Sequence, residues 1–341
     1  MPDCKGQIVC SVCVAHYNDT AVLAECLDAL LKQTADFTIE IIVHDDASTD
    51  DSVSFIRTNF PMVKIIPSSF NVGYCLANNR MASIARGRFL LLLNNDATLL
   101  PDALATLLHE AESLDLPAIL TLPQYAASDG RLLDRGSLLD PFYNNIPNLD
   151  PSRLEVAMVA GACLWLPASL WRNLGGFPPW FGNLAEDLLI CCRARLAGYP
   201  VRVAAGSGYR HRVGHTLGGG KSAPGRLNST FRRRALSERN KTFVMMLCDP
   251  LPLLLLRLPL HLVLLLLEGG ILAMLKVDRR WLTHIYWPVL PALWRHRIQL
   301  SCMRGSIQQH RVTGIVRYLS KFRCWPRKLV LLMRHGLPRL S

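Results

Sequence analysis

The C-terminal part of the sequence lacks acidic residues. Residues 279–341 contain 13 lysines and arginines but no aspartate or glutamate, whereas residues 1–278 hold the other 25 basic residues and all 26 acidic ones. The overall charge of +12 therefore describes neither part of the chain. A near-neutral part is followed by a basic tail, of the kind that binds an anionic membrane surface or nucleic acid.

Other features that would define a class of protein are also missing. The 11 cysteines are scattered, which predicts reduced thiols in a cytosol rather than a disulfide framework or a zinc site. The first residues, MPDCKGQIVC, contain no long apolar run, so no secretory signal peptide is expected. Hydrophobic residues make up 50% of the 341 residues, which excludes a disordered chain and allows one large domain or two ordinary ones.

The strongest structural signal is RGRFLLLLNNDATLLP, residues 86–101. Phe89 and the four leucines after it form a short apolar run, typical of a strand buried on both faces of a parallel sheet. The run ends in Asn94, Asn95 and Asp96. Ligands of open α/β sheets bind beyond the carboxyl ends of strands, so Asp96 is placed for chemistry. The alternative is that Asp96 only caps a turn.

Strands and helices are predicted to alternate, which favours an α/β fold with a mostly parallel sheet and right-handed crossovers. Ser48 to Asp51 resembles a capping box, with Ser48 as the N-cap of a helix that ends near Asn59. Strands are expected at 8–15, 39–43, 63–66, 89–93 and 157–167, and helices at 21–33, before residue 86, from Pro101 to about Ser113, and from about Ala185. Loops are expected at 125–155, with room for a hairpin, and at 205–226, a segment predicted to be mobile.

Acidic residues recur where these elements end or begin. Asp45 ends the second strand and Asp96 follows the fourth, so both are expected at one edge of the sheet, while Glu186 and Asp187 open a helix. Such carboxylates can hold a nucleotide, bind a divalent metal or act as a general base. Turn formation by Asp45 and a solvated helix start at Glu186 and Asp187 are the alternatives.

Seven motifs, in order over about residues 8–245, resemble the family-2 glycosyltransferases. They are VAHYNDTAVLAECLDAL, IIVHDDASTDDS, NVGYCLANNRMASIARGRFLLLLNNDATLLP, GACLWLPASLWRNLGGFPPWF, AEDLLICCRARLAGYPV, HRVGHT and RNKTF. The resemblance implies a GT-A fold, a Rossmann-like and mostly parallel sheet flanked by helices. It also implies an inverting enzyme similar to the rhamnosyltransferase-like enzymes that build bacterial envelope polysaccharides.

The resemblance implies a role for each matching residue. Asp187 matches the catalytic base, and Leu189 stands where relatives often have a further acid. Asp96 matches the last acid of a DxD-type motif, with Asn94 in the place of the first, and His211, in a pattern with Gly214 and Thr216, matches a second ligand of Mg²⁺ or Mn²⁺. The residues that match the donor side are Asp45, Asn71, Gly73, Asn79 and Asp96.

The segment before Glu186 is rich in proline and aromatic residues. Trp180 and Phe181 suit the face of a sugar ring, although packing is the plainer explanation. We expect Trp180, Phe181 and Glu186 to contact the acceptor. The reaction that the resemblance implies is a single displacement at the anomeric carbon of a nucleotide-diphospho-sugar, with Asp187 deprotonating the acceptor hydroxyl.

The composition changes near residue 245, which predicts a glycosyltransferase domain at 1–244 and a helical, membrane-associating region at 245–341. Residues 251–267 are apolar but contain Pro259 and Arg257. This favours helices lying in the cytoplasmic leaflet over a membrane span. Residues 306–323 have the pattern of one amphipathic surface helix, although a packed helical subdomain would show the same pattern.

The function expected from the sequence is transfer of a hexose or deoxyhexose from a nucleotide-diphospho-sugar to a lipid-linked glycan in envelope polysaccharide synthesis. The enzyme would be peripheral or monotopic at the cytoplasmic face of the inner membrane, bound to its anionic surface and not to nucleic acid. Two rivals remain. A nucleic-acid-binding protein would explain the basic tail, but the tail contains no recognisable nucleic-acid-binding motif. A nucleotidyltransferase would need a glycine-rich loop with basic residues after the first strand, where the sequence has AHYNDT instead.

Overall fold

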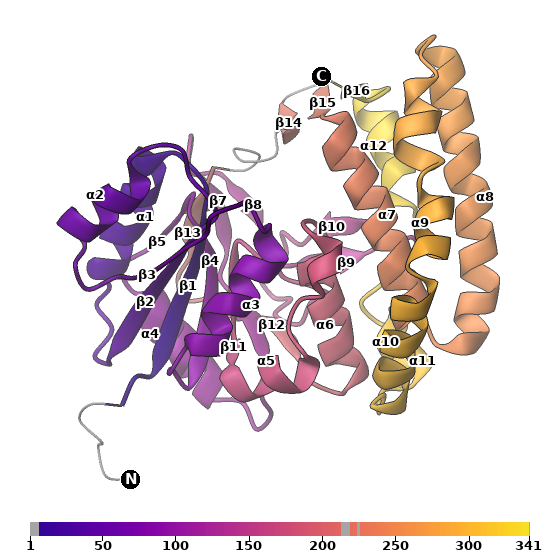
Figure 1. Ribbon diagram of the computed structural model, residues 1–341. Helices are drawn as coiled ribbons and strands as arrows, with labels where there is room; N and C mark the ends of the chain where they lie inside the picture. The colour runs from indigo at the N-terminus through magenta and orange to yellow at the C-terminus, as the bar shows by residue number, and fades with distance from the viewer. Residues whose placement is uncertain (1–6, 213–218, 224–225, 341) are drawn as a thin grey trace. The chain divides into compact units, whose positions relative to one another are not determined.

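The computed structural model describes residues 7–212, 219–223 and 226–340, and its residues group into two compact units (Figure 1). The sheet unit comprises Met1–Ser137, Pro147–Ala194 and Tyr199–Arg212, and the helical unit comprises Leu138–Ile146, Arg195–Gly198 and Val213–Ser341. Each unit is described by itself below.

A seven-stranded sheet forms the centre of the sheet unit. Its strands lie in the order β12 (Val201–Val203), β6 (Ile119–Thr121), β11 (Cys163–Pro167), β4 (Phe89–Asn94), β1 (Cys10–His16), β2 (Ile39–Asp45) and β3 (Lys64–Pro67). β11 is antiparallel to β4 and β6, and the remaining pairs are parallel. The mostly parallel sheet expected from the sequence is therefore confirmed. A smaller sheet has the order β5 (Ala97–Leu99), β13 (Tyr209–His211), β7 (Gln124–Ala126) and β8 (Leu132–Asp134).

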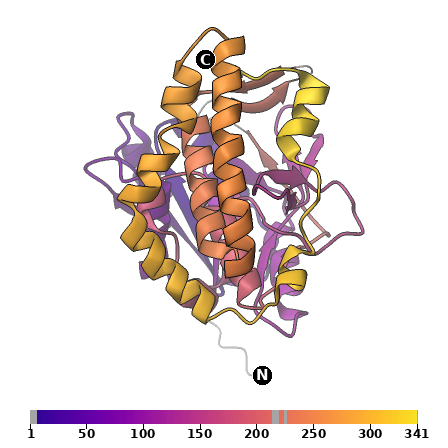
Figure 2. The same cartoon turned by 90° about the vertical axis from the view of Figure 1, so that its right-hand side faces the viewer.

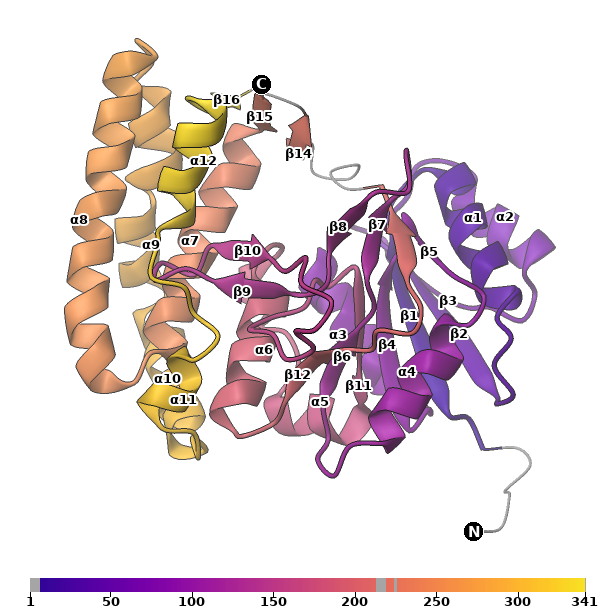
Figure 3. The same ribbon diagram turned by 180° about the vertical axis from the view of Figure 1, so that it is seen from behind.

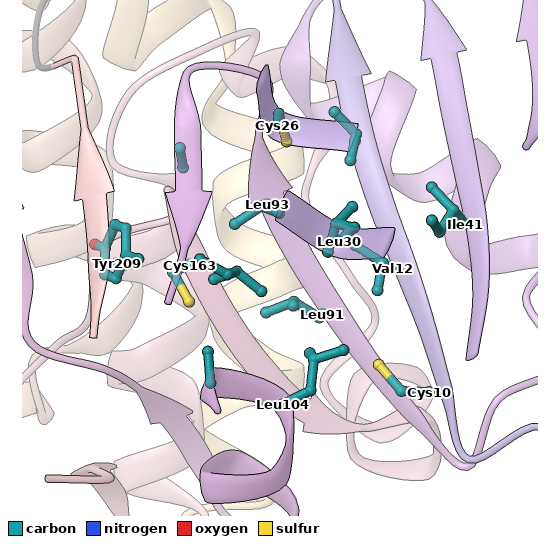
Figure 4. Close-up of a cluster of buried hydrophobic side chains, with 14 of the residues drawn as sticks. Cys10, Val12, Cys26, Leu30, Ile41, Leu91, Leu93, Leu104, Cys163 and Tyr209 are labelled. Carbon is teal, nitrogen blue, oxygen red and sulfur yellow. The ribbon is translucent and has the colours of Figure 1, made fainter. Parts of the chain in front are cut away.

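Both faces of the central strands are buried, as the Leu-rich run predicted. Leu91 and Leu93 of β4 join a cluster with Val12 of β1 and with residues of α1 (Thr20–Leu31) and α4 (Ala103–Glu112), part of which is drawn in Figure 4. Figure 3 shows α4 across this face. The alternate leucines, Leu90 and Leu92, are buried on the opposite face, where Figure 1 shows α3 (Tyr74–Ile84) and α5 (Ala168–Leu174) in front of the sheet.

Eight of the ten described cysteines are buried. Cys10 and Cys13 have C-x-x-C spacing, but residues three apart in a strand point to opposite faces. They therefore pack separately in the core and make neither a disulfide nor a metal site.

Two local predictions for the sheet unit are wrong. Ser48 is not a helix N-cap, because its hydroxyl accepts a hydrogen bond from the Asn18 amide (2.9 Å), and α2 (Ser52–Asn59) begins four residues later. Residues 209–211 are not a mobile loop but strand β13, paired with β5 and β7. Residues 213–218 and 224–225 of that predicted loop lie outside the described residues.

The helical unit, seen face on in Figure 2, is a group of helices around a small apolar core of Leu265, Leu272, Trp281, Ile285, Tyr286 and Val289. Its helices are α7 (Phe231–Cys248), α8 (Leu251–Leu275), η2 (Trp281–Tyr286), α9 (Val289–Arg295), α10 (Arg297–Gln309), α11 (Ile315–Leu319) and α12 (Arg327–His335). The predicted domain boundary after residue 244 falls inside α7 and stays a prediction. The single helix predicted at 306–323 is wrong, because the chain leaves the helix between Gln309 and Ile315.

Short elements complete the chain. They are the strands β9 (Ser137–Leu139), β10 (Asn145–Pro147), β14 (Gly219–Ala223), β15 (Arg226–Ser229) and β16 (Arg339–Leu340), the short helix η1 (Pro179–Phe181), and α6 (Glu186–Leu196). The segment 125–155 thus holds more strand than expected, since β7 and β8 pair as one hairpin and β9 and β10 pair with each other. Within the described residues, α8 is the one helix long and apolar enough to cross a membrane, by length and composition alone.

Candidate active site

The carboxyl ends of β1, β2 and β4 meet at one edge of the central sheet. His16 of β1 lies opposite Asp45 of β2, and Ala15 lies opposite Asn94 of β4. The expectation that Asp45 and Asp96 share this edge is therefore confirmed. Both side chains are buried, with 3% and 6% of their surface exposed.

Asp45 and Asp46, at the end of β2, have different hydrogen-bond partners. Asp45 Oδ2 accepts a hydrogen bond from the Ser48 amide (3.1 Å), while its Oδ1 is buried and has no hydrogen-bond partner in the described part of the chain. Asp46 accepts hydrogen bonds from the amides of Val72 (2.6 Å) and Gly73 (2.9 Å). Asp46 thus builds the loop before α3, whereas Asp45 keeps one buried oxygen without a protein hydrogen bond in the described residues, and its contact with a donor stays a prediction.

The predicted donor-side residues Asn71, Gly73 and Asn79 lie in or just after this loop. Asn71 Nδ2 donates to the Asp46 carbonyl (3.3 Å), and Gly73 has a φ of +82°, which favours glycine. Asn79 donates to the Phe177 carbonyl (2.7 Å) and accepts from its amide (3.0 Å). Asn79 therefore fixes the segment before η1, and a direct contact with the donor stays a prediction for it.

Asn95 and Asp96 form the two-residue turn between β4 and β5. Strand β13 pairs with β5 and brings His211 opposite Ala97, so that His211 Nε2 lies 3.0 Å from Asp96 Oδ1. The opposite ring nitrogen, Nδ1, lies 2.9 Å from Gln124 Nε2 and is fixed by it. The two predicted metal ligands, Asp96 and His211, are thus brought together. No group of three or more His, Cys, Asp and Glu able to hold a metal occurs among the residues described.

Asp187 lies at the start of α6 and is bound to the segment before β11. Its Oδ2 accepts from the Gly161 amide (3.0 Å) and its Oδ1 from the Leu188 amide (2.7 Å), while the Tyr74 hydroxyl donates to the Gly161 carbonyl (2.9 Å). The Asn94 amide donates to the adjacent carbonyl of Ala162 (3.1 Å). This chain of hydrogen bonds connects the candidate base to the end of β4.

The two acids of α6 have different surroundings. Burial raises the pKa of Glu186 well above its usual range, and the nearby Asp187 carboxylate raises it further. Glu186 Oε2 has no hydrogen-bond partner within the described ranges. Burial also raises the pKa of Asp187, but its hydrogen bonds from Gly161 and Leu188 oppose that rise. Glu186 is therefore the acid that stays protonated longer, and Asp187 is the better candidate for the ionised base.

The backbone just before α6 is strained. Leu184 and Ala185 both have positive φ, at 71° and 65°, a region that costs non-glycine residues roughly 1–2 kcal/mol. Backbone strain of this kind is concentrated at functional sites. It fixes the direction in which Glu186 and Asp187 leave the turn.

Trp180 and Phe181, predicted to contact the acceptor, differ in exposure. Trp180 is half-buried, whereas Phe181 is fully buried and stacks edge to face on Trp180 with ring centroids 4.8 Å apart. Any effect of Phe181 on an acceptor is therefore indirect, through the position of Trp180. Gly214 and Thr216, from the pattern that begins at His211, lie outside the described residues.

Sequence reasoning missed His16, Asp46 and Tyr74. Asp46 could have been found as the second of two acids at a strand end. His16 and Tyr74 carry no local signal, because their partners, such as Asn95 for His16 and Gly161 for Tyr74, lie 79 and 87 residues away.

The fold and the carboxylates at its sheet edge define a GT-A glycosyltransferase, and comparison with known families agrees. The family described as Glycosyl transferase family 2 matches residues 11–166, and the one described as Glycosyl transferase family group 2 matches residues 89–295. The latter covers more than half of the chain. The chain belongs to the family-2 glycosyltransferases.

Relatives of known name align with part of the chain. Chondroitin synthase of Escherichia coli is 27% identical over 180 residues, covering 52% of this chain and 25% of the relative. Poly(ribitol-phosphate) beta-glucosyltransferase of Bacillus spizizenii is 26% identical over 210 residues, covering 60% of this chain and 32% of the relative. The chain thus spans about a third or less of the length of these two relatives.

Solved structures share the fold. S. aureus TarS in complex with UDP-GlcNAc has a TM-score of 0.57 at 18% identity, covering 89% of both chains. The mannosyltransferase PcManGT from Pyrobaculum calidifontis, in complex with GDP-Man and Mn²⁺, has a TM-score of 0.53 at 20% identity, covering 87% of this chain and 89% of that one. At these identities the likeness establishes the fold alone.

Proposed function

We propose that this glycosyltransferase moves a hexose or deoxyhexose, with inversion, from a nucleotide-diphospho-sugar to a hydroxyl of a lipid-linked glycan in envelope polysaccharide synthesis. The names of its relatives support the polymer class, since two are a chondroitin synthase and a poly(ribitol-phosphate) glucosyltransferase. The titles of the similar structures support the donor class, since they name UDP-GlcNAc and GDP-Man.

The arrangement of Asp96 and His211 is the observation that carries this proposal. Asp96 Oδ1 lies 3.0 Å from His211 Nε2, yet this oxygen is buried and makes no hydrogen bond to any described residue. A buried carboxylate oxygen is costly unless it is paired or binds a metal. A carboxylate oxygen beside an imidazole nitrogen suits Mn²⁺ or Mg²⁺, with diphosphate oxygens as further ligands. When bound, such an ion offsets the charge on the departing diphosphate.

The remaining residues supply binding and proton transfer. Asp45 Oδ1 would accept a hydrogen bond from the base or ribose of the donor, beside the loop that Asn71 and Gly73 form. Asp187 would take the proton of the acceptor hydroxyl, whose oxygen then bonds to the anomeric carbon. The bond from that carbon to the diphosphate breaks, and its electron pair leaves with the nucleoside diphosphate. Glu186 and Trp180 would contact the acceptor.

The exposed face of α8 supports a position at the membrane. Its polar side chains are held by protein groups, since Arg257 pairs with Asp249 (3.0 Å), His261 Nε2 lies 2.9 Å from the Thr242 hydroxyl, and Glu268 pairs with Arg234 (2.8 Å). The outer face consists of exposed apolar residues, among them Leu251, Leu255, Leu256, Leu260, Val263, Leu267, Ile271 and Met274. A helix of this kind suits the surface of the cytoplasmic leaflet better than a span, and the basic tail suits anionic headgroups.

Calorimetry of nucleoside diphosphates with and without Mn²⁺ tests the proposal. UDP or GDP should bind to the wild type more tightly when Mn²⁺ is present, and Asp96→Ala should abolish that gain without unfolding the protein. Asp115→Ala, which removes an exposed aspartate, is the control and should bind like the wild type. Retention of the Mn²⁺-dependent gain by Asp96→Ala would overturn the proposed site.

A further inference from the structure

His16 is a buried residue at the centre of the sheet edge, with only 1% of its surface exposed. Its Nδ1 lies 3.0 Å from Asn95 Nδ2, and its Nε2 lies 2.8 Å from the Ser52 hydroxyl. The Ser52 hydroxyl in turn donates to Asp50 Oδ1. A row of side chains thus runs from the turn after β4, through the end of β1, to the start of α2.

The direction of the hydrogen bonds along this row is fixed. Partial burial alone would raise the pKa of Asp50, but the hydrogen bonds from Ser52 and Thr20 outweigh it and lower that pKa, so Asp50 is an ionised acceptor. Ser52 must then accept from His16 Nε2–H, which leaves Nδ1 without a proton and ready to accept from the Asn95 amide. Burial also lowers the pKa of His16, against the opposing charges of Asp45, Asp50 and Asp19, which agrees with a neutral ring.

The Asn95 side chain belongs to the same two-residue turn as Asp96. At Asp96 the backbone of this turn is held by Arg212, whose amide donates to the Asp96 carbonyl (3.1 Å). At Asn95 the turn is held by the His16 ring. The main chain of His16 also contributes, since its carbonyl accepts from the Asp46 amide (2.8 Å). One residue therefore connects the turn that carries Asp96 with the residue that builds the loop before α3.

We propose that His16 is a positioning residue, whose neutral ring holds Asn95 and thereby fixes the Asp96 carboxylate beside His211 for a divalent cation. This inference rests on the proposed function, because it needs Asp96 to bind the cation. A residue that orients a metal ligand through a hydrogen bond typically changes metal affinity by about 10–100-fold when it is replaced. We expect the lower end of that range, because His16 acts on Asp96 through its neighbour.

Two conservative substitutions separate the two ends of the ring. In His16→Asn the side-chain oxygen reaches the position of Nδ1 and can accept from Asn95, but nothing reaches Ser52. In His16→Gln the amide reaches the position of Nε2 and Ser52, but Asn95 loses its acceptor. If the Asn95 contact is the one that matters, His16→Asn should keep the Mn²⁺-dependent affinity for UDP or GDP within about threefold of wild type. His16→Gln should lower it about tenfold.

A second readout needs no metal. In the metal-free protein the amides of Asn95, Asp96 and Ala97 should exchange with deuterium faster in His16→Gln than in the wild type, and His16→Asn should resemble the wild type. Equal losses in both variants, together with equal drops in melting temperature, would show a merely structural role and overturn the inference. So would wild-type affinity in His16→Gln. Asp96→Ala, measured alongside, distinguishes the two proposals, because retained Mn²⁺-dependent binding in that variant would refute the metal site itself.

Discussion

Buried carboxylates have different surroundings in the two units. In the sheet unit Asp45, Asp96 and Glu186 are buried, and each keeps an oxygen with no hydrogen-bond partner in the residues described. In the helical unit each buried carboxylate named here has a cation beside it, as Asp249 has Arg257 at 3.0 Å and Glu238 has Lys241 at 3.2 Å, although Glu238 Oε2 also makes no hydrogen bond within the described residues. Unpaired buried carboxylates lower stability, whereas paired ones can hold helices together. Nearby cations thus offset the buried charge in the helical unit, whereas the sheet-unit carboxylates keep oxygens for the ligand proposed above.

The largest expected effect is in the sheet unit. Asp187→Asn should lower turnover by about 10²–10⁴-fold, because asparagine accepts no proton and general-base catalysis contributes about that factor. Donor affinity should be nearly unchanged. Single-turnover rates with saturating donor, and calorimetry for the affinity, measure the two quantities separately.

Asparagine also turns an NH₂ group toward one of the two amides that Asp187 now accepts from, so the melting temperature must be measured alongside. A variant within a few-fold of the wild-type rate would mean that the base lies elsewhere, with Glu186 next to be tested.

The next effect is on the stability of the helical unit. Glu238 is 3% exposed and lies 3.2 Å from Lys241 Nζ and 2.8 Å from Lys328 Nζ. Glu238→Ala leaves the buried Lys241 uncompensated, which should lower the free energy of unfolding by about 3–5 kcal/mol in chemical denaturation. The matched control is Glu112→Ala, which breaks the half-exposed pair with Arg88 and should cost about 1 kcal/mol or less. Similar losses in both variants would remove the distinction between buried and surface pairs.

A smaller effect is expected on membrane binding. Leu256 on the outer face of α8 is 70% exposed. Leu256→Glu should lower the affinity for anionic liposomes, measured by sedimentation, about tenfold, since burying a leucine contributes about 1.5–3 kcal/mol. Leu116→Glu, at an exposed leucine of the sheet unit, is the control. Deletion of residues 279–341 is a poorer test, because it also removes Trp281, Ile285 and Tyr286 from the core of the helical unit. If Leu256→Glu sediments with liposomes as the wild type does, and both proteins have the same single oligomeric state, this face is excluded as the lipid contact.

The last effect concerns Glu186 and depends on pH. Burial raises the pKa of Glu186 in the folded protein above its pKa in the unfolded chain. Its contribution to stability is therefore complete at pH values below the unfolded-state pKa and is lost as the pH rises through the folded-state pKa. Glu186→Gln cannot ionise, so its stability relative to wild type should increase with pH, by about 1.4 kcal/mol for each unit of raised pKa. Thermal melts across pH 4–9 would show a constant difference if Glu186 were not perturbed.

The sequence predicted those parts of the site that follow from strand ends. The apolar run before Asn94 placed Asp96 correctly, and the alternation of elements placed Asp45 at the same edge. Partners brought in by distant chain segments leave no local signal, so the family resemblance supplied His211 but His16 and Tyr74 were missed. The prediction that Ser48 caps a helix was wrong, because its hydroxyl accepts a hydrogen bond from Asn18 in the loop after β1. In the tail, helical periodicity at 306–323 did not reveal the break near Thr313, a buried residue whose hydroxyl donates to the Arg195 carbonyl (2.7 Å).

The left-handed pair Leu184 and Ala185 has a consequence for how this enzyme tolerates mutation. Glycine at either position would relieve backbone strain, so the change should raise thermal stability. It would also make the turn before Glu186 and Asp187 more flexible, so that the candidate base would spend less time in the reactive position. Selection for thermal stability would therefore favour glycine here, and selection for turnover would disfavour it.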